Sequence, residues 1–101
     1  MTRTDHLLAI LIEEAAEVQQ RATKALRFGL KETQPGQSLD NTERLVGELN
    51  DLLAAIDLLQ REGILPCTVG DSAALIRKQE RIEKYFARSR EMGRLDEGDA
   101  S

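Results

Sequence analysis

Two stretches decide the fold: LIEEAAEVQQ, residues 11–20, and GELNDLLAAIDLL, residues 47–59. In each stretch the apolar residues recur at the three- and four-residue spacing of an amphipathic helix. The acidic residues keep the same spacing; they are Glu13, Glu14 and Glu17 in the first stretch and Glu48 and Asp51 in the second. Side chains three and four residues apart lie on one side of a helix. Two such helices, packed together, would therefore bring four or five carboxylates to one place.

The apolar pattern outside these stretches predicts an all-α chain with three main helices. The first helix is expected over Leu7–Phe28, with Thr4 or Asp5 as its N-cap and Gly29 after its last turn. A polar loop with Pro35 and Gly36 follows.

The second helix is expected to begin at Asp40 or Asn41, with Glu43 completing a capping box, and to run through Arg61 or Glu62. Gly63 and Pro66 end it. The third helix is expected from Ala73 to about Met92, capped by Asp71 or Ser72. Its apolar stripe is narrow and comprises Leu75, Ile76, Ile82 and Phe86.

The composition fits one small helical domain that associates with itself. A chain of 101 residues with no Trp, one Tyr and two Phe must build its core from Leu, Ile, Val and Ala. The second helix is apolar over more than half its circumference, which three helices cannot cover. We therefore expect a homodimer, or a tetramer of dimers, in which two chains complete a four-helix-bundle-like core.

The charge and the single cysteine limit the partners and the cellular compartment that we expect. The net charge of −4 comes from 18 acidic and 14 basic residues, and removing the five clustered acids leaves 13 against 14. The acidity is therefore local, and no nucleic-acid polymer is expected as a partner. Cys67 has no second cysteine to pair with, and no run approaches a membrane span, so a cytoplasmic protein is expected. A single domain is expected over residues 1–93, followed by a polar, disordered tail over residues 94–101.

The acids do not all follow the solvent side of their helices. In a helical projection Glu14 falls at the margin of the apolar arc, and Glu48 and Asp51 point along apolar flanks. An unpaired carboxylate in such a place costs several kcal/mol, so each should meet a cation. Two sources of cations remain open: a metal, for which oxygen ligands suit Mg²⁺ or Mn²⁺, and a buried salt-bridge network with Arg21, Lys24 and Arg44.

The pattern Glu13-Glu14-x-x-Glu17, followed by Glu48-x-x-Asp51, resembles the EExxE…ExxD signature of the MazG-like all-α nucleoside triphosphate pyrophosphohydrolases. The resemblance covers about Asp5 to Leu59. Two features depart from the family pattern. Thirty residues, 18–47, separate the two motifs, and the third helix has Arg81 where the family often has Asn.

The resemblance implies hydrolysis of a nucleoside triphosphate, often a deoxynucleotide, to the monophosphate and pyrophosphate. It implies that Glu14, Glu17, Glu48 and Asp51 hold Mg²⁺, with Mn²⁺ as a substitute, and that Glu13 helps to activate water. Phosphate oxygens would meet the basic residues of the first helix, which are Arg21, Lys24 and Arg27. Two alternatives remain: hydrolysis of phosphoribosyl-ATP, and a non-catalytic helical interaction protein whose acids only balance basic residues.

Overall fold

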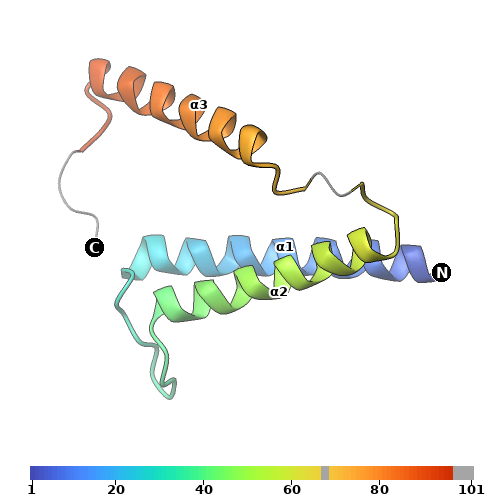
Figure 1. The fold of residues 1–101 in the computed structure, drawn as a ribbon. Coiled ribbons are helices and arrows are strands. Elements are labelled where there is room, and N and C mark those ends of the chain that lie inside the picture. Colours follow the sequence, from blue (N-terminus) through green and yellow to red (C-terminus); the bar gives the residue numbers. More distant parts are fainter. Residues whose placement is uncertain (67–68, 97–101) are drawn as a thin grey trace. The chain divides into compact units, whose positions relative to one another are not determined.

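The computed structural model describes residues 1–66 and 69–96, and within these ranges it is all-helical (Figure 1). The helices are α1 (Arg3–Phe28), α2 (Asn41–Arg61) and α3 (Ser72–Glu91). This confirms the all-α prediction with three helices. The chain divides into two compact units, one with α1 and α2 (Met1–Pro66) and one with α3. The single domain expected over residues 1–93 stays a prediction, and Cys67 and residues 97–101 of the expected tail lie outside the described ranges.

Helix α1 begins earlier than the sequence predicted. Thr2 is the N-cap, and its hydroxyl accepts a hydrogen bond from the backbone N–H of Asp5, whose carboxylate accepts one from the N–H of Thr2. The prediction of Thr4 or Asp5 as the cap was therefore wrong. Asp5 instead completes a capping box from the third helical position, which satisfies two N–H groups at once.

The starts of α2 and α3 were predicted correctly. Asp40 caps α2 and forms a capping box with Glu43, and Asp71 caps α3 by accepting a hydrogen bond from the N–H of Ala74. Helix α2 ends at Arg61, and Gly63 follows with a φ of 73°, which only glycine adopts without strain. The C-terminal bounds of these two helices therefore agree with the sequence to within a residue.

Helices α1 and α2 pack side by side as an antiparallel pair (Figure 1). The Arg3 guanidinium binds both carboxylate oxygens of Glu62 at 2.8 Å, which fixes the start of α1 against the end of α2. Glu17 and Glu48 also meet across the pair. Arg3 and Glu17 are separated by the same number of residues as Glu48 and Glu62, so the two helices keep one register, and this register places Asp51 level with Glu14.

The loop between α1 and α2 is tied to the first turn of α2. The Thr42 N–H and hydroxyl both donate to the Leu30 carbonyl, at 3.0 Å each. The fully buried Asn41 side chain donates to the Gly29 carbonyl and to the Glu32 carboxylate, at 2.8 and 2.9 Å. Arg44 donates to the Gln34 side chain at 2.7 Å. These bonds tie the first turn of α2 to the loop. The Thr42 bond also satisfies one of the backbone N–H groups that a helix leaves unpaired at its start.

The helix pair buries few apolar side chains: Leu7, Ala25, Ala55 and Leu59. Nine larger apolar residues remain exposed on the two helices. Antiparallel right-handed helices turn in opposite senses when viewed from one end, so helical geometry places six of them on one side of the pair: Leu8, Ile12 and Leu26 of α1, and Val46, Leu49 and Leu53 of α2. We call these six residues the apolar side; Ile10, Phe28 and Leu58 project to the other side.

Glu13, Glu17 and Asp51 project to the opposite side of the pair, which we call the acidic side. The apolar side could therefore pack against another protein surface, and the acidic side concentrates negative charge.

Asn41 should hold the loop in place, so Asn41→Ala should lower the free energy of unfolding by about 1–3 kcal/mol, the cost of unpaired buried polar groups. Chemical denaturation followed by circular dichroism measures this. Asn50→Ala, an exposed change on the same helix, is the matched control. Equal stability of the two variants would show that the Asn41 bonds do not contribute.

Candidate functional site

The contact between α1 and α2 has charged residues where a helix pair usually has apolar ones. Two rows of α1 face α2, and in each the residues recur every seven positions; they are Leu7, Glu14 and Arg21, and Leu11, Val18 and Ala25. On α2 the facing rows are Asn41, Glu48 and Ala55, and Leu45, Leu52 and Leu59, and all twelve residues are buried or half-buried. Glu14, Arg21 and Glu48 therefore lie among apolar residues of the contact, and we call these three the charged seam.

Three of the predicted acids meet at this point. Glu14, Glu17 and Glu48 each offer one carboxylate oxygen, and these oxygens all lie within 4.8 Å of one another. We call these three residues the acidic cluster. Glu14 and Glu48 are half-buried, and one oxygen of each (Oε2) is buried without a hydrogen-bond partner among the described residues. Buried carboxylate oxygens without partners are costly, so the cluster has unused capacity to bind a cation.

The neighbouring acids change the pKa of Glu48. A hydrogen bond with the Glu17 carboxyl raises the pKa of Glu48, and burial and the negative charges of Glu17 and Asp51 raise it further. The positive charge of Arg21 opposes the shift. Without a metal, Glu48 therefore holds its proton to a higher pH than a free glutamate would.

The other two predicted acids lie beside the cluster rather than within it. Asp51 is exposed, which corrects the expectation that it points along an apolar flank; it projects to the acidic side, close enough to raise the pKa of Glu48. Glu13 is also exposed, as expected from its place on the polar side of α1. The structure thus brings Glu14, Glu17 and Glu48 together and leaves Glu13 and Asp51 at the solvent edge.

The predicted basic residues occupy three different environments. Arg21 is only 8% exposed, and its Nη1 atom is buried without a hydrogen-bond partner among the described residues. Lys24 is half-buried, and Arg27 is exposed with its guanidinium 5.2 Å from the centre of the Phe28 ring. Arg44 binds Gln34 in the loop rather than an acid of the cluster, so the structure provides one cation for the seam where a salt-bridge network would need several.

A shallow hollow lies along α1 over residues 16–27. Lys24 and Arg27 line it together with four uncharged residues: Ala16, Gln19, Gln20 and Thr23. Helical spacing places most of this lining on the face of α1 turned away from α2, and only Lys24 shares the stripe of Glu13 and Glu17. The sequence offered Arg21 both as a phosphate ligand and as part of a buried salt-bridge network; its burial agrees with the second expectation.

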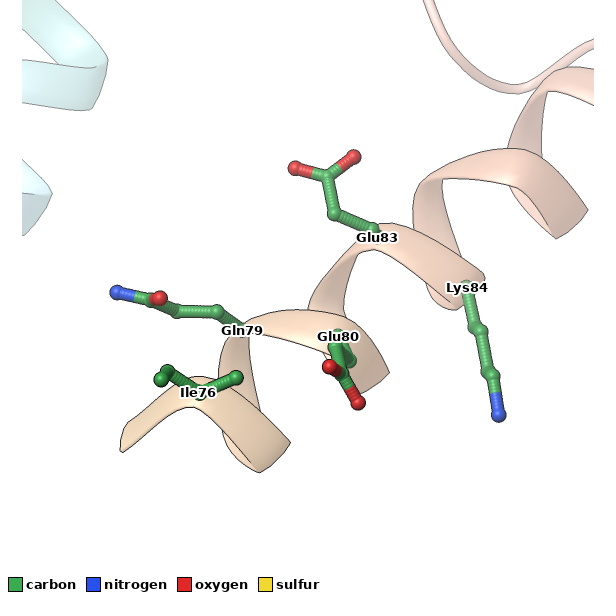
Figure 2. Close-up of a pocket in the computed structure, with 5 residues that line it drawn as sticks. All are labelled: Ile76, Gln79, Glu80, Glu83 and Lys84. Atoms are coloured by element: carbon green, nitrogen blue, oxygen red, sulfur yellow. The ribbon is translucent and has the colours of Figure 1, made fainter. Parts of the chain in front are cut away.

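Helix α3 offers a second hollowed surface, shown in Figure 2. Its lining residues are Ile76, Gln79, Glu80, Glu83 and Lys84. All five come from successive turns of one helix and are exposed. Apolar, acidic and basic side chains are mixed on this surface, and the side chains of Glu83 and Lys84 point to different sides (Figure 2). This surface is an open helix face rather than an enclosed site.

Comparisons with protein-family models, with curated proteins and with solved structures give no match. Within the described ranges, the helices are too short or too polar to cross a membrane. The function is therefore inferred from the arrangement of the residues themselves.

The raised pKa of Glu48 predicts a pH dependence of stability in the absence of metal. The native state holds the proton more tightly than the unfolded chain, so this contribution is fully present below the ordinary glutamate pKa and is lost as the pH rises through the raised pKa. Glu48→Gln should remove it, which would leave the variant more stable than the wild type above that window.

Thermal melts from pH 4 to 8 with a chelator measure the difference between the two proteins. Asp57→Asn, which changes an exposed acid on the same helix, should track the wild type apart from a small constant offset. A constant difference between Glu48→Gln and wild type across the range would contradict the coupling of Glu17 and Glu48.

Proposed function

We propose that the chain is a metal-dependent nucleoside triphosphate pyrophosphohydrolase of the MazG-like kind. The single observation that carries the proposal is the convergence of Glu14, Glu17 and Glu48 within 4.8 Å, where Glu14 and Glu48 each have one buried oxygen without a partner among the described residues and Glu17 is exposed. These are three of the four acids that the resemblance makes metal ligands; the fourth is Asp51. Stability alone would not favour half-buried carboxylates at Glu14 and Glu48, because an apolar residue at either position would cost less.

The donor set fits Mg²⁺ or Mn²⁺. It consists of carboxylate oxygens from Glu14, Glu17 and Glu48, and Asp51, which lies level with Glu14 beside the cluster, would be the fourth ligand. These hard oxygen ligands suit divalent magnesium and manganese. When bound, the metal would neutralise phosphate charge and lower the pKa of a coordinated water.

The remaining residues would serve the substrate. Lys24 shares the acidic stripe of α1 and would contact phosphate oxygens there, and Arg27 lies further round the helix, in the hollow that Lys24 also lines. Glu13 lies at the exposed edge of the cluster, where it would accept the proton from the attacking water. The water oxygen bonds to the α-phosphorus as the bond from that phosphorus to the bridging oxygen breaks, and pyrophosphate leaves with the electron pair. The reaction depends on positioning and charge stabilisation, so it needs no Ser, Cys or His nucleophile.

A second copy of the chain is part of the proposal. The apolar side of the helix pair is exposed, with Ile12 69% and Leu53 60% accessible, and it lies opposite the acidic side. Two pairs packed through their apolar sides would form a four-helix bundle with an acidic cluster on each outer face. A homodimer in this arrangement leaves both candidate sites open to substrate.

The activity is tested by pyrophosphate release from ribo- and deoxynucleoside triphosphates with Mg²⁺ or Mn²⁺. Glu14→Gln and Asp51→Asn should each lower kcat/KM by at least about 100-fold, the scale lost when a transition-state charge loses one stabilising group. Asp57→Asn, an exposed acid on the same helix as Asp51, is the matched control and should retain activity.

Release of both monophosphate and pyrophosphate would establish the reaction, and the ranking of substrates would identify the nucleotide. Phosphoribosyl-ATP belongs in the same panel. If no nucleotide is turned over, and metal leaves the melting temperatures of wild type and variants unchanged, the non-catalytic interaction protein becomes the better reading.

The assembly is tested by sedimentation velocity at micromolar concentrations. The wild type should sediment as a dimer or larger, and Leu53→Arg should shift it toward the monomer because a charge in the apolar contact is costly. Asn50→Arg puts the same side chain on the exposed stripe of α2 and should leave the assembly intact. A wild-type monomer would remove the second copy from the proposal.

A further inference from the structure

Arg21 is the buried cation of the charged seam. It follows Glu14 by seven residues and Glu17 by four, so it projects from α1 between these two acids and toward α2. Its side chain is 8% exposed, and its buried Nη1 atom lacks a hydrogen-bond partner among the described residues. Its charge acts on Glu48 across the helix contact.

This placement separates Arg21 from the other basic residues of α1. The sequence groups it with Lys24 and Arg27 as a phosphate ligand, but a nucleotide approaching from solvent cannot reach a buried Nη1. Lys24 and Arg27 line an open hollow, and Arg21 does not. Among the described residues no ion pair within 4.0 Å joins Arg21 to an acid, so its charge acts on Glu48 at longer range from within the helix contact.

We infer that Arg21 is a positioning residue, a resident counter-charge whose buried guanidinium offsets the negative charge of the acidic cluster when no metal is bound. Three carboxylates and one guanidinium leave a formal charge of −2, which one divalent cation neutralises. The guanidinium also repels an incoming cation. Arg21 therefore weakens the binding of free metal and favours a cation that arrives already bound to the anionic nucleotide.

The affinity part of this inference rests on the metal site of the proposed function, and the counter-charge part does not. Both are tested without any nucleotide. Arg21→Met removes the charge and keeps the aliphatic bulk, and Arg21→Lys keeps the charge. Arg27→Met, an exposed cation on the same helix, is the matched control.

The first measurement is a double-mutant cycle of Arg21→Met and Glu48→Gln by thermal denaturation with a chelator. Arg21→Met should lower Tm by about 5 °C or more, because it leaves buried carboxylates uncompensated. In the Glu48→Gln background the same change should cost less than half as much. Arg21→Lys should lie closer to wild type than Arg21→Met. Additive losses, or equal losses for Lys and Met, would overturn the counter-charge role.

The second measurement is the rise of Tm on titration with Mg²⁺ or Mn²⁺ alone, which reports binding to the native state. Arg21→Met should bind the metal about tenfold more tightly than wild type, and Arg21→Lys and Arg27→Met should match wild type. Arg21→Met with unchanged affinity in a wild type that does bind metal would overturn the affinity claim. If no protein responds to metal while the cycle shows coupling, the metal site of the proposed function fails and the counter-charge stands.

Discussion

The structure depends on a charged contact in the middle of its only described helix–helix interface. At the positions where α1 meets α2, Glu14, Arg21 and Glu48 replace the apolar residues that would hold such a pair most cheaply. Four small or medium apolar side chains form the core around them. The Arg3–Glu62 pair at one end and the Asn41 bonds at the other then hold the register of a contact that its own centre weakens. Half-buried carboxylates lower the stability of this contact, and the proposed metal would offset that cost.

The two sides of the helix pair differ in the residues that they expose. The side with Leu8, Ile12, Leu26, Val46, Leu49 and Leu53 supplies the apolar area that the core lacks, because these residues are exposed in a single chain. The opposite side carries the exposed acids Glu13, Glu17 and Asp51 and the half-buried Lys24. Association through one side would thus stabilise the helices without covering the acids on the other.

The sequence predicted the helices well because their signals are local. The spacing of apolar residues, the Asp40–Glu43 capping box and the glycines after α1 and α2 each act within a few residues, and only the N-cap of α1 was misplaced. The convergence of Glu14, Glu17 and Glu48 also followed from helical spacing together with an assumed contact. The exposure of Asp51 and the bond of Arg44 to Gln34 did not follow, because they depend on the rotation and register of one helix against the other. No periodicity within a single helix contains that information.

The shared register of α1 and α2 also bears on which length changes the chain would tolerate in evolution. Arg3–Glu62 and Glu17–Glu48 lie on matched levels, so adding or deleting one residue within either helix between these levels would turn half of the acidic cluster by about 100° away from the other half. The loop over residues 29–40 lies outside the segment that those two contacts define. Insertions there affect the loop's own bonds to Asn41, Thr42 and Arg44 but leave the register of the two helices unchanged, so a longer separation between the two acidic motifs is compatible with their convergence.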